Sequence, residues 1–271
     1  MVPLQWSPWI SFDAASFSAL SAGPGVYRVR AMGHEALAYI GQTGRDLRAR
    51  LRDLRRNTLS ELMPFNDPHT AAPSLWAWRD AEGHQFECSA APVDLDTRNR
   101  LGLEAWLLWQ HRLEHGSTLC NFGRFHPHYV KSGDRKTQRR GGRLGPGAVN
   151  TAGGPTSTPL RLLGQPVSAD WMGLPWGPWA PLHKAASAGP GLYRIAGDGD
   201  GLLYVGESED VGKRLKAHRA RDWGTAPLVS VWSAPTDTRK HQLHELENDL
   251  IGAHVHMAGM PPQHQFGSSI K

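Results

Sequence analysis

A short pattern of glycine and tyrosine occurs twice in the chain and constrains its fold more than any other feature. Gly25-Val26-Tyr27 is followed by Tyr39-Ile40-Gly41, and Gly191-Leu192-Tyr193 is followed by Tyr204-Val205-Gly206. In each copy two apolar, β-branched runs flank a glycine-containing turn, which predicts a β-hairpin. The sequence therefore predicts two copies of one small domain, each organised around a hairpin.

The repeat also includes a tryptophan-rich arm before each hairpin. Residues 4–9 (LQWSPW) return as residues 174–179 (LPWGPW). We expect both arms to be structural, with their tryptophans packed on the hairpin or on the other copy.

Helices are expected after each hairpin and at the end of each copy. Leucines recur at helical spacing from Leu47 to Leu54, and longer helices are predicted over 97–115 and 238–256. Between them, residues 57–73 are expected to form a loop. Short strands are predicted at 74–78, 85–90 and 228–232. The predicted fold class is α+β, with two tandem small domains, each a short antiparallel sheet flanked by helices.

Domain boundaries follow from the repeat and from a change in composition. The first copy is predicted over residues 1–125 and the second over 171–271, joined by a basic, Gly/Pro-rich linker at 126–170. The linker shows no periodicity, so no packed structure is expected of it without nucleic acid.

Positive charge is concentrated in two places. The formal net charge is +5, with six arginines between Arg45 and Arg56 and six basic residues between Lys131 and Arg143. Clusters of one sign in a basic chain favour a polyanion as partner, and nucleic acid is the leading candidate. The candidate nucleic-acid-binding residues are Arg45, Arg48, Arg52, Arg55, Lys131, Lys136, Arg139, Arg140, Arg143, Lys213 and Lys216.

Membrane and secretory classes are not favoured. No apolar run approaches the length of a membrane span, and the first residues lack the features of a signal peptide. Cys88 and Cys120 are too few and too far apart for a disulfide framework. We expect a cytoplasmic protein in which both cysteines are structural.

The two long helices carry the same pattern of a carboxylate, two apolar residues and a histidine. Glu104 and His111 bracket two leucines in the first, and Glu247 and His254 bracket Leu250 and Ile251 in the second. A carboxylate on an apolar face is costly unless it is paired or binds a metal, so its recurrence favours a site. The alternative is a glutamate that pairs with arginine, and Glu245 is the other candidate for the site.

The repeated residues resemble the signature of GIY-YIG endonucleases. The resemblance rests on GVY with YIG and on GLY with YVG, each followed by an arginine, and covers about residues 17–125 and 185–267. It implies a nuclease that uses one Mg²⁺ (or Mn²⁺) per active site and acts on double-stranded or branched DNA.

By this resemblance, Glu104 and Glu247 hold the metal and Tyr27 and Tyr193 act as base or orient the water. The arginines contact the scissile phosphate and the second tyrosines assist there. The family commonly ends in an asparagine, which the first copy has and the second replaces by glutamine. The remaining residues with implied roles are Tyr39, Tyr204, Arg50, Arg214, Asn121 and Gln265.

Histidines distinguish the two copies. His218 stands four residues after Arg214, on the same helix face and within reach of the same phosphate or of the water, whereas Leu54 stands at that position in the first copy. The pairs His111 with His115 and His254 with His256 have no evident third metal ligand, so a solvated or packing role is favoured for them.

Two hypotheses remain. The first is a magnesium-dependent endonuclease in which one chain acts as a pseudo-dimer without an obligate protein partner. The second is a nucleic-acid-binding protein in which one or both sites are silent. Nearly complete sets of site residues in both copies favour the nuclease.

Overall fold

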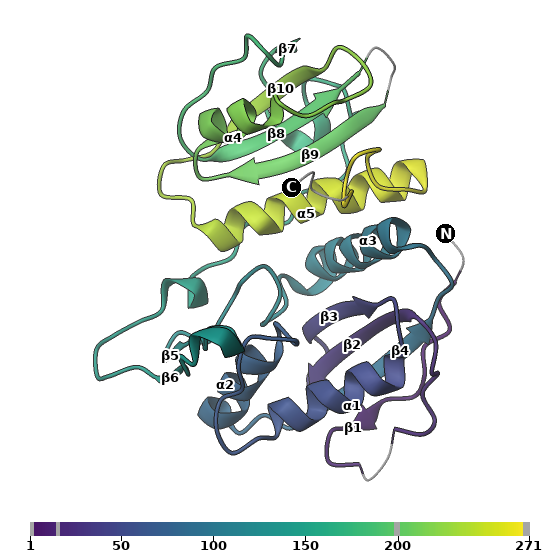
Figure 1. The fold of residues 1–271 in the computed structure, drawn as a ribbon, viewed down its shortest axis with the longest axis vertical. Coiled ribbons are helices and arrows are strands. Elements are labelled where there is room, and N and C mark those ends of the chain that lie inside the picture. The colour runs from purple at the N-terminus through teal and green to yellow at the C-terminus, as the bar shows by residue number, and fades with distance from the viewer. Residues whose placement is uncertain (1–2, 15–16, 198–200, 268–271) are drawn as a thin grey trace. The chain divides into compact units, whose positions relative to one another are not determined.

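The computed structural model describes residues 3–14, 17–197 and 201–267, and within these the chain is a mixed α+β protein with antiparallel sheets (Figure 1). The glycine-containing turn predicted for the second hairpin falls partly on residues 198–200, which lie outside the described residues. The fold class predicted from the sequence is confirmed.

The first sheet has four antiparallel strands in the order β1-β4-β2-β3. The predicted hairpin is β2 (Gly25–Ala31) with β3 (Leu37–Thr43). β4 (Phe86–Pro92) pairs with the other edge of β2, and the short β1 (Ile10–Ser11) pairs with β4.

The second sheet repeats this arrangement, with strand order β7-β10-β8-β9. Its hairpin is β8 (Gly191–Ala196) with β9 (Leu202–Ser208), its third strand is β10 (Leu228–Ser233), and its edge strand is β7 (Ala180–Pro181). In both hairpins the register shifts at the corresponding place, between Val29 and Arg30 and between Ile195 and Ala196.

Each hairpin is followed by a helix that an aspartate caps. α1 (Leu47–Thr58) begins after Asp46, whose side chain accepts from the Ala49 N–H, and α4 (Val211–His218) begins after Asp210, which accepts from the Lys213 N–H. These caps satisfy N–H groups that a helix start otherwise leaves unpaired. Leu47, Leu51 and Leu54 are buried on one face, as their spacing predicts.

The long helices lie close to where the sequence predicts them. α3 spans Thr97–His115, and α5 spans Lys240–Ala258, two residues later than predicted. α5 and α4 both pack against β8 and β9 (Figure 1).

The strand predicted at 74–78 is wrong. This stretch belongs to α2 (Ala72–Glu82), with Pro73 in its first turn and Gly83 as a left-handed C-cap. Six consecutive residues from Ala72 to Ala77 are buried, and a run that is apolar on all sides does not distinguish a buried helix from a buried strand. The strand that corresponds to β10 is therefore β4, predicted at 85–90.

The tryptophan arms pack on arginines of their own hairpins. Arg28 lies over the rings of Trp6 and Trp9, at 4.3 and 4.7 Å from the ring centroids. Arg194 lies over Trp176 and Trp179 at 4.5 and 4.7 Å. Of the two packing partners predicted for the arms, the structure shows the hairpin.

The linker has a packed structure, contrary to the prediction. Tyr129 is fully buried against Trp76, and its segment forms a small ladder of β5 (Tyr129–Val130) and β6 (Gly142–Arg143). The short 3₁₀ turn η1 (Arg135–Thr137) lies between these strands, η2 (Thr151–Gly153) follows them, and η3 (Trp171–Gly173) lies just after the linker. Composition showed the polar surface of this segment but not the buried aromatic residue that orders it.

The chain divides into two compact units. The first comprises Met1–Arg100 and Glu114–Pro155, and the second comprises Leu101–Leu113 and Thr156–Lys271. Each unit holds one four-stranded sheet. The boundaries differ from the predicted ones, because the linker is divided between the units after Pro155 and Leu101–Leu113 of α3 belongs to the second unit.

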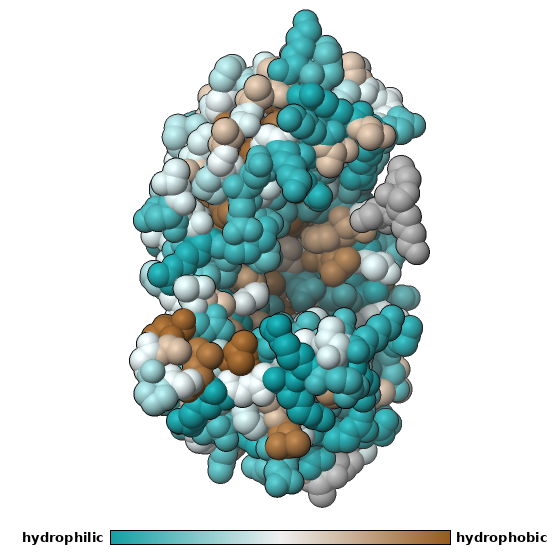
Figure 2. Space-filling view, turned by 60° about the vertical axis from the view of Figure 1, so that its left-hand side comes forward, coloured by the Kyte–Doolittle hydropathy of each residue, from teal (hydrophilic) through white to brown (hydrophobic). Residues whose placement is uncertain are grey.

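The face drawn in Figure 2 is mostly hydrophilic, with small separate apolar spots. Among the described residues no helix combines the length and apolar character that spanning a bilayer requires.

Candidate active site

The first tyrosine of each hairpin is buried beside the last glycine of the pattern. Tyr27 stands opposite Gly41 across the strands and Tyr193 stands opposite Gly206. A Cβ atom on Gly206 would lie 2.2 Å from the Tyr193 hydroxyl oxygen, and one on Gly41 would lie 2.7 Å from that of Tyr27. The glycines are thus needed because a tyrosine ring crosses their backbone.

Each capped helix then aims its arginine at that tyrosine. The Arg50 Nε donates to the Tyr27 hydroxyl at 3.2 Å, and the Arg214 Nε donates to the Tyr193 hydroxyl at 3.3 Å. In both helices the arginine follows the capping aspartate by four residues. The aspartate cap therefore fixes the turn from which the guanidinium reaches the strand.

In the second copy a histidine completes this cluster. The His218 Nε2 lies 2.8 Å from the Tyr193 hydroxyl, and its ring lies 5.2 Å from the ring of Tyr204. Since Arg214 can only donate to the hydroxyl oxygen, the tyrosine proton is available to a neutral imidazole nitrogen. Tyr193 thus links a cation to a proton acceptor.

Tyr204, Arg214 and His218 border one cavity of about 340 Å³ in the second unit. Glu247, on α5, also lines this cavity. The sequence-predicted residues that line the cavity are Tyr204, Arg214, His218, Glu247 and Gln265.

The environment sets the protonation of the cavity groups. Burial, with help from Arg214 and Arg221, lowers the pKa of His218 to about 4, so the imidazole is neutral at pH 7. Burial raises the pKa of Tyr193, which keeps its hydroxyl protonated. Burial, reinforced by the carboxylate of Glu207, raises the pKa of Glu247 to about 7.

Glu247 meets the requirements of an anchor for a hydrated cation. Because burial raises the pKa of this carboxyl group to about 7, a cation beside it would stabilise its charged form, and the cavity has room for water ligands. In the described parts of the chain no three metal-ligating side chains come together. The site therefore fits a cation such as Mg²⁺, which keeps most of its waters, better than a metal held by several side chains.

The two amides that close the copies have the same structural partner. Asn121 accepts from the Ile40 N–H at 3.0 Å and donates to the Ile40 carbonyl at 2.8 Å. Gln265 accepts from the Val205 N–H at 3.0 Å. The longer glutamine thus reaches the equivalent strand residue, and both amides hold the second strand of their hairpin in place.

In the first copy the structure brings together the hairpin, the helix arginine and the amide. The rings of Tyr27 and Tyr39 lie 6.0 Å apart, and Arg50 donates to Tyr27 as described. Glu104 is half-buried on α3, in the segment Leu101–Leu113 that belongs to the second compact unit. Leu54 is fully buried in the core at the position that corresponds to His218.

Glu245 lies in a different environment from Glu247. It is fully buried 3.4 Å from the Arg112 Nη1, and Arg112 also pairs with Asp249 at 2.8 Å. Ser157 donates its backbone N–H to the same Glu245 carboxylate at 2.6 Å. Pairing with arginine, the alternative weighed for the helix carboxylate, is thus the arrangement of Glu245.

The remaining helix histidines have packing environments. The His254 Nδ1 lies 2.9 Å from the Met260 carbonyl oxygen, and the His256 ring lies 5.8 Å from that of Trp109. His254 is buried and His256 is exposed, where a solvated or packing role was predicted for the pair.

Two arginines predicted to bind nucleic acid donate to backbone carbonyls. Arg48 donates twice to the Leu20 carbonyl, at 2.9 and 2.7 Å, and Arg55 donates to the Phe12 carbonyl. Arg45 and Arg52 are exposed. The number of charges in the sequence could not distinguish the two exposed arginines from the two bound to the backbone, because all four lie on α1 or just before it.

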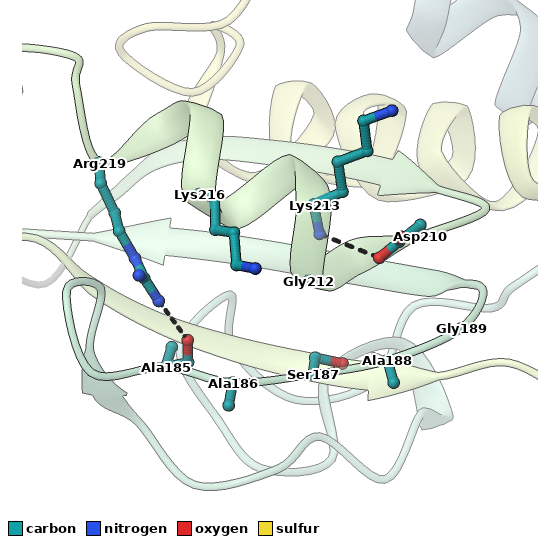
Figure 3. Close-up of a pocket in the computed structure, with 10 residues that line it drawn as sticks. All are labelled: Ala185, Ala186, Ser187, Ala188, Gly189, Asp210, Gly212, Lys213, Lys216 and Arg219. Atoms are coloured by element: carbon teal, nitrogen blue, oxygen red, sulfur yellow. Dashed lines mark hydrogen bonds between the residues drawn. The ribbon is translucent and has the colours of Figure 1, made fainter.

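A second cavity, of about 600 Å³, lies between α4 and the loop at 185–189 (Figure 3). Lys213 and Lys216 both line it, and in Figure 3 Lys216 extends toward the loop while Lys213 points away. Arg219 donates to the Ala185 carbonyl at 2.7 Å and so ties the loop to the helix. Cations on an accessible surface beside the site are suited to phosphate contacts.

The basic segment, defined as residues 131–143, is positioned by aromatic contacts. Arg140 lies 4.3 Å from the Phe65 ring centroid and donates to the Met63 carbonyl, and Arg143 lies 5.2 Å from that of Tyr129. Lys131 is half-buried, and burial lowers its pKa. The exposed candidates of this segment are Lys136, Arg139, Arg140 and Arg143.

Sequence reasoning missed part of the cavity lining. Arg221 and His264 both border the cavity, and Arg221 donates to the His264 carbonyl at 3.4 Å. Neither has a counterpart in the repeat, so the duplication gave no signal for them. The available signal was their position in the sequence, because Arg221 lies three residues after His218 and His264 directly precedes Gln265.

Comparisons of the chain with protein families, with curated proteins and with solved structures found no match. Function is therefore inferred from the geometry of the site itself.

Proposed function

We propose that the chain is a divalent-metal-dependent endonuclease of the GIY-YIG type that hydrolyses phosphodiester bonds in DNA. One observation carries this proposal: Arg214 and His218 of α4 and Glu247 of α5 line one cavity of the second copy, and the Tyr193 hydroxyl of β8 lies within hydrogen-bond distance of both α4 side chains. Such a combination of phosphate-binding, proton-accepting and metal-anchoring groups is what hydrolysis of a phosphodiester requires.

In this proposal the side chains of the second copy have separate tasks. Arg214, which is exposed, neutralises the charge on the phosphoryl oxygens. Tyr193 orients the attacking water, and its proton moves toward His218 as the water loses its own. Tyr204 assists at the phosphate from the neighbouring strand.

Glu247 would hold Mg²⁺ or Mn²⁺ through its carboxylate, and Glu104 is the equivalent candidate in the first copy. The bound cation would supply charge stabilisation to the phosphoryl oxygens. Gln265 and Asn121 act indirectly, because their amides hold the strand that carries the second tyrosine.

The duplication supports a pseudo-dimer. Both sheets have the same strand order and both tyrosine–arginine pairs have the same geometry. One chain with two sites has the parts that a symmetric dimer uses on the two strands of a duplex, so no protein partner is required. Both cysteines are free and buried, which accords with a reducing compartment, and we place the activity in the cytoplasm.

Plasmid cleavage tests the proposal. Wild-type protein with Mg²⁺ is expected to nick or linearise supercoiled DNA, and Glu247→Gln is expected to slow the second site at least 100-fold while DNA binding survives. Glu209→Gln, which changes an exposed carboxylate directly before the Asp210 cap, is the matched control and keeps wild-type rates. Linear, single-stranded and branched DNAs in the same assay define the substrate structure.

A protein that binds these DNAs but cuts none of them with Mg²⁺ or Mn²⁺ would refute the nuclease proposal. That result would favour the alternative, a nucleic-acid-binding protein with silent sites. Unchanged cleavage in Glu247→Gln together with Glu104→Gln would refute the metal assignment alone.

A further inference from the structure

A histidine that the repeat does not contain lies beside the tyrosine–arginine pair of the first copy. His69 stands in the loop between α1 and α2, and only 3% of its surface is exposed. Neither of its ring nitrogens has a hydrogen-bond partner among the described residues. A buried imidazole with two unpaired nitrogens is costly, so its presence calls for a functional explanation.

Arg50 connects this loop to the hairpin. The same guanidinium donates from Nε to the Tyr27 hydroxyl at 3.2 Å and from Nη1 to the Pro68 carbonyl at 3.3 Å. His69 is the next residue in the chain. Burial and the charge of Arg50 lower the pKa of His69 to about 4, so its ring is neutral at pH 7 and able to accept a proton.

The second copy has an imidazole beside the corresponding tyrosine hydroxyl. There His218 comes from the helix and contacts the Tyr193 hydroxyl. In the first copy that helix position is Leu54, which is 1% exposed in the core. The first site thus lacks the helical histidine, and a loop histidine lies next to the arginine instead.

We propose that His69 is the proton acceptor of the first site and replaces there the imidazole that His218 provides in the second. This inference rests on the proposed nuclease function. In the step, the water oxygen forms a bond to phosphorus while the bond to the leaving ester oxygen breaks. The water proton passes to an unpaired ring nitrogen of His69, and the leaving oxygen takes a proton from solvent.

The loop that carries His69 is held by the basic segment. The Asn66 N–H donates to the Gly133 carbonyl at 3.0 Å, and the Arg135 N–H donates to the Asp67 carboxylate at 2.7 Å. On the other side, the His69 carbonyl accepts from the Ala72 N–H at 3.1 Å, at the start of α2. A polyanion bound to the basic segment would therefore act on the same loop that positions the imidazole.

The test uses a protein in which only the first site acts, Tyr193→Phe with Glu247→Ala. In this background His69→Ala is expected to slow nicking of supercoiled DNA about 100-fold, the lower end of what a positioned proton acceptor contributes. His34→Ala, an exposed histidine of the same unit, is the control and nicks at the rate of the background protein.

Chemical rescue separates proton acceptance from packing. Added imidazole is expected to restore nicking by His69→Ala, whereas pyrazole, an isomer of the same size and a far weaker base, is expected not to restore it. Rescue by both compounds or by neither overturns the proposal, as does a His69→Ala protein that nicks at the background rate. If the background protein and the wild type both fail to cut DNA, the nuclease function itself is wrong and this inference falls with it.

Discussion

His218 makes the stability of the second unit depend on pH in a way that can be measured. Its pKa is about 4 in the folded protein and 6.5 for an ordinary histidine. The unfolded chain therefore takes up the proton first as pH falls, and protonation favours unfolding. Stability from this residue is complete above pH 6.5 and is lost progressively down to pH 4.

The size of the effect follows from the same pKa values. Each pH unit over which only the unfolded chain is protonated is worth about 1.4 kcal/mol. Between pH 7.5 and pH 5 the wild type is thus expected to lose about 2 kcal/mol through His218 alone. Asp249 and Glu247, whose pKa values burial raises to about 6 and about 7, contribute with the opposite sign.

Comparison with His218→Gln isolates the histidine from these carboxylates. Urea unfolding at pH 7.5 and pH 5 is expected to show about 2 kcal/mol less acid destabilisation in His218→Gln than in the wild type. His183→Gln, which changes an exposed histidine of the same unit, is expected to behave as wild type. If His218→Gln loses as much stability on acidification as the wild type, the imidazole does not have the buried, neutral state described here.

Three further changes test the scaffold and the nucleic-acid surface. Gly206→Ala is expected to destabilise the second unit by about 1–3 kcal/mol, because its Cβ meets the Tyr193 hydroxyl, while Gly201→Ala, with open space around it, should leave the thermal midpoint unchanged. Arg112→Met leaves two buried carboxylates without their cation and is expected to cost about 3–5 kcal/mol in urea unfolding; a loss below 1 kcal/mol would contradict the buried pairing. Replacing exposed arginines of the basic segment by glutamine is expected to flatten the salt dependence of DNA binding by about one unit of slope per lost phosphate contact, and an unchanged slope would show that the segment does not contact phosphates; the residues are Arg139, Arg140 and Arg143.

Local patterns predicted those parts of the site that lie on regular elements. The two apolar runs around a glycine-containing turn predicted the hairpin in which Tyr193 stands opposite Gly206, and helical spacing placed Glu247 on the same face as Leu250 and Ile251. In the structure Glu247 and Ile251 line one cavity. These positions depend on periods of two and of 3.6 residues, which are properties of the chain itself.

The parts that escaped prediction depend on contacts between distant segments. His69 follows Pro68, whose carbonyl accepts from Arg50, in a loop whose course is set by the basic segment and by α2, and no period in the sequence encodes that course. The first half of α2 escaped for a related reason, since Ala72 to Ala77 are all buried and leave no polar face there to reveal the turn of the helix.

The two copies differ along the helix that carries the arginine. Where the first copy has Arg48, whose guanidinium binds the Leu20 carbonyl, the second has Gly212, and a Cβ there would lie 2.2 Å from the Ser187 carbonyl oxygen. The loop at 185–189 therefore approaches α4 closely in the second copy, and the cavity with Lys216 lies between them. In a symmetric dimer each such change would appear at both sites, whereas in a fused pair each copy changes alone. Under the proposed function, the two strands of a duplex would thus meet different basic surfaces, and the DNA target need not be palindromic.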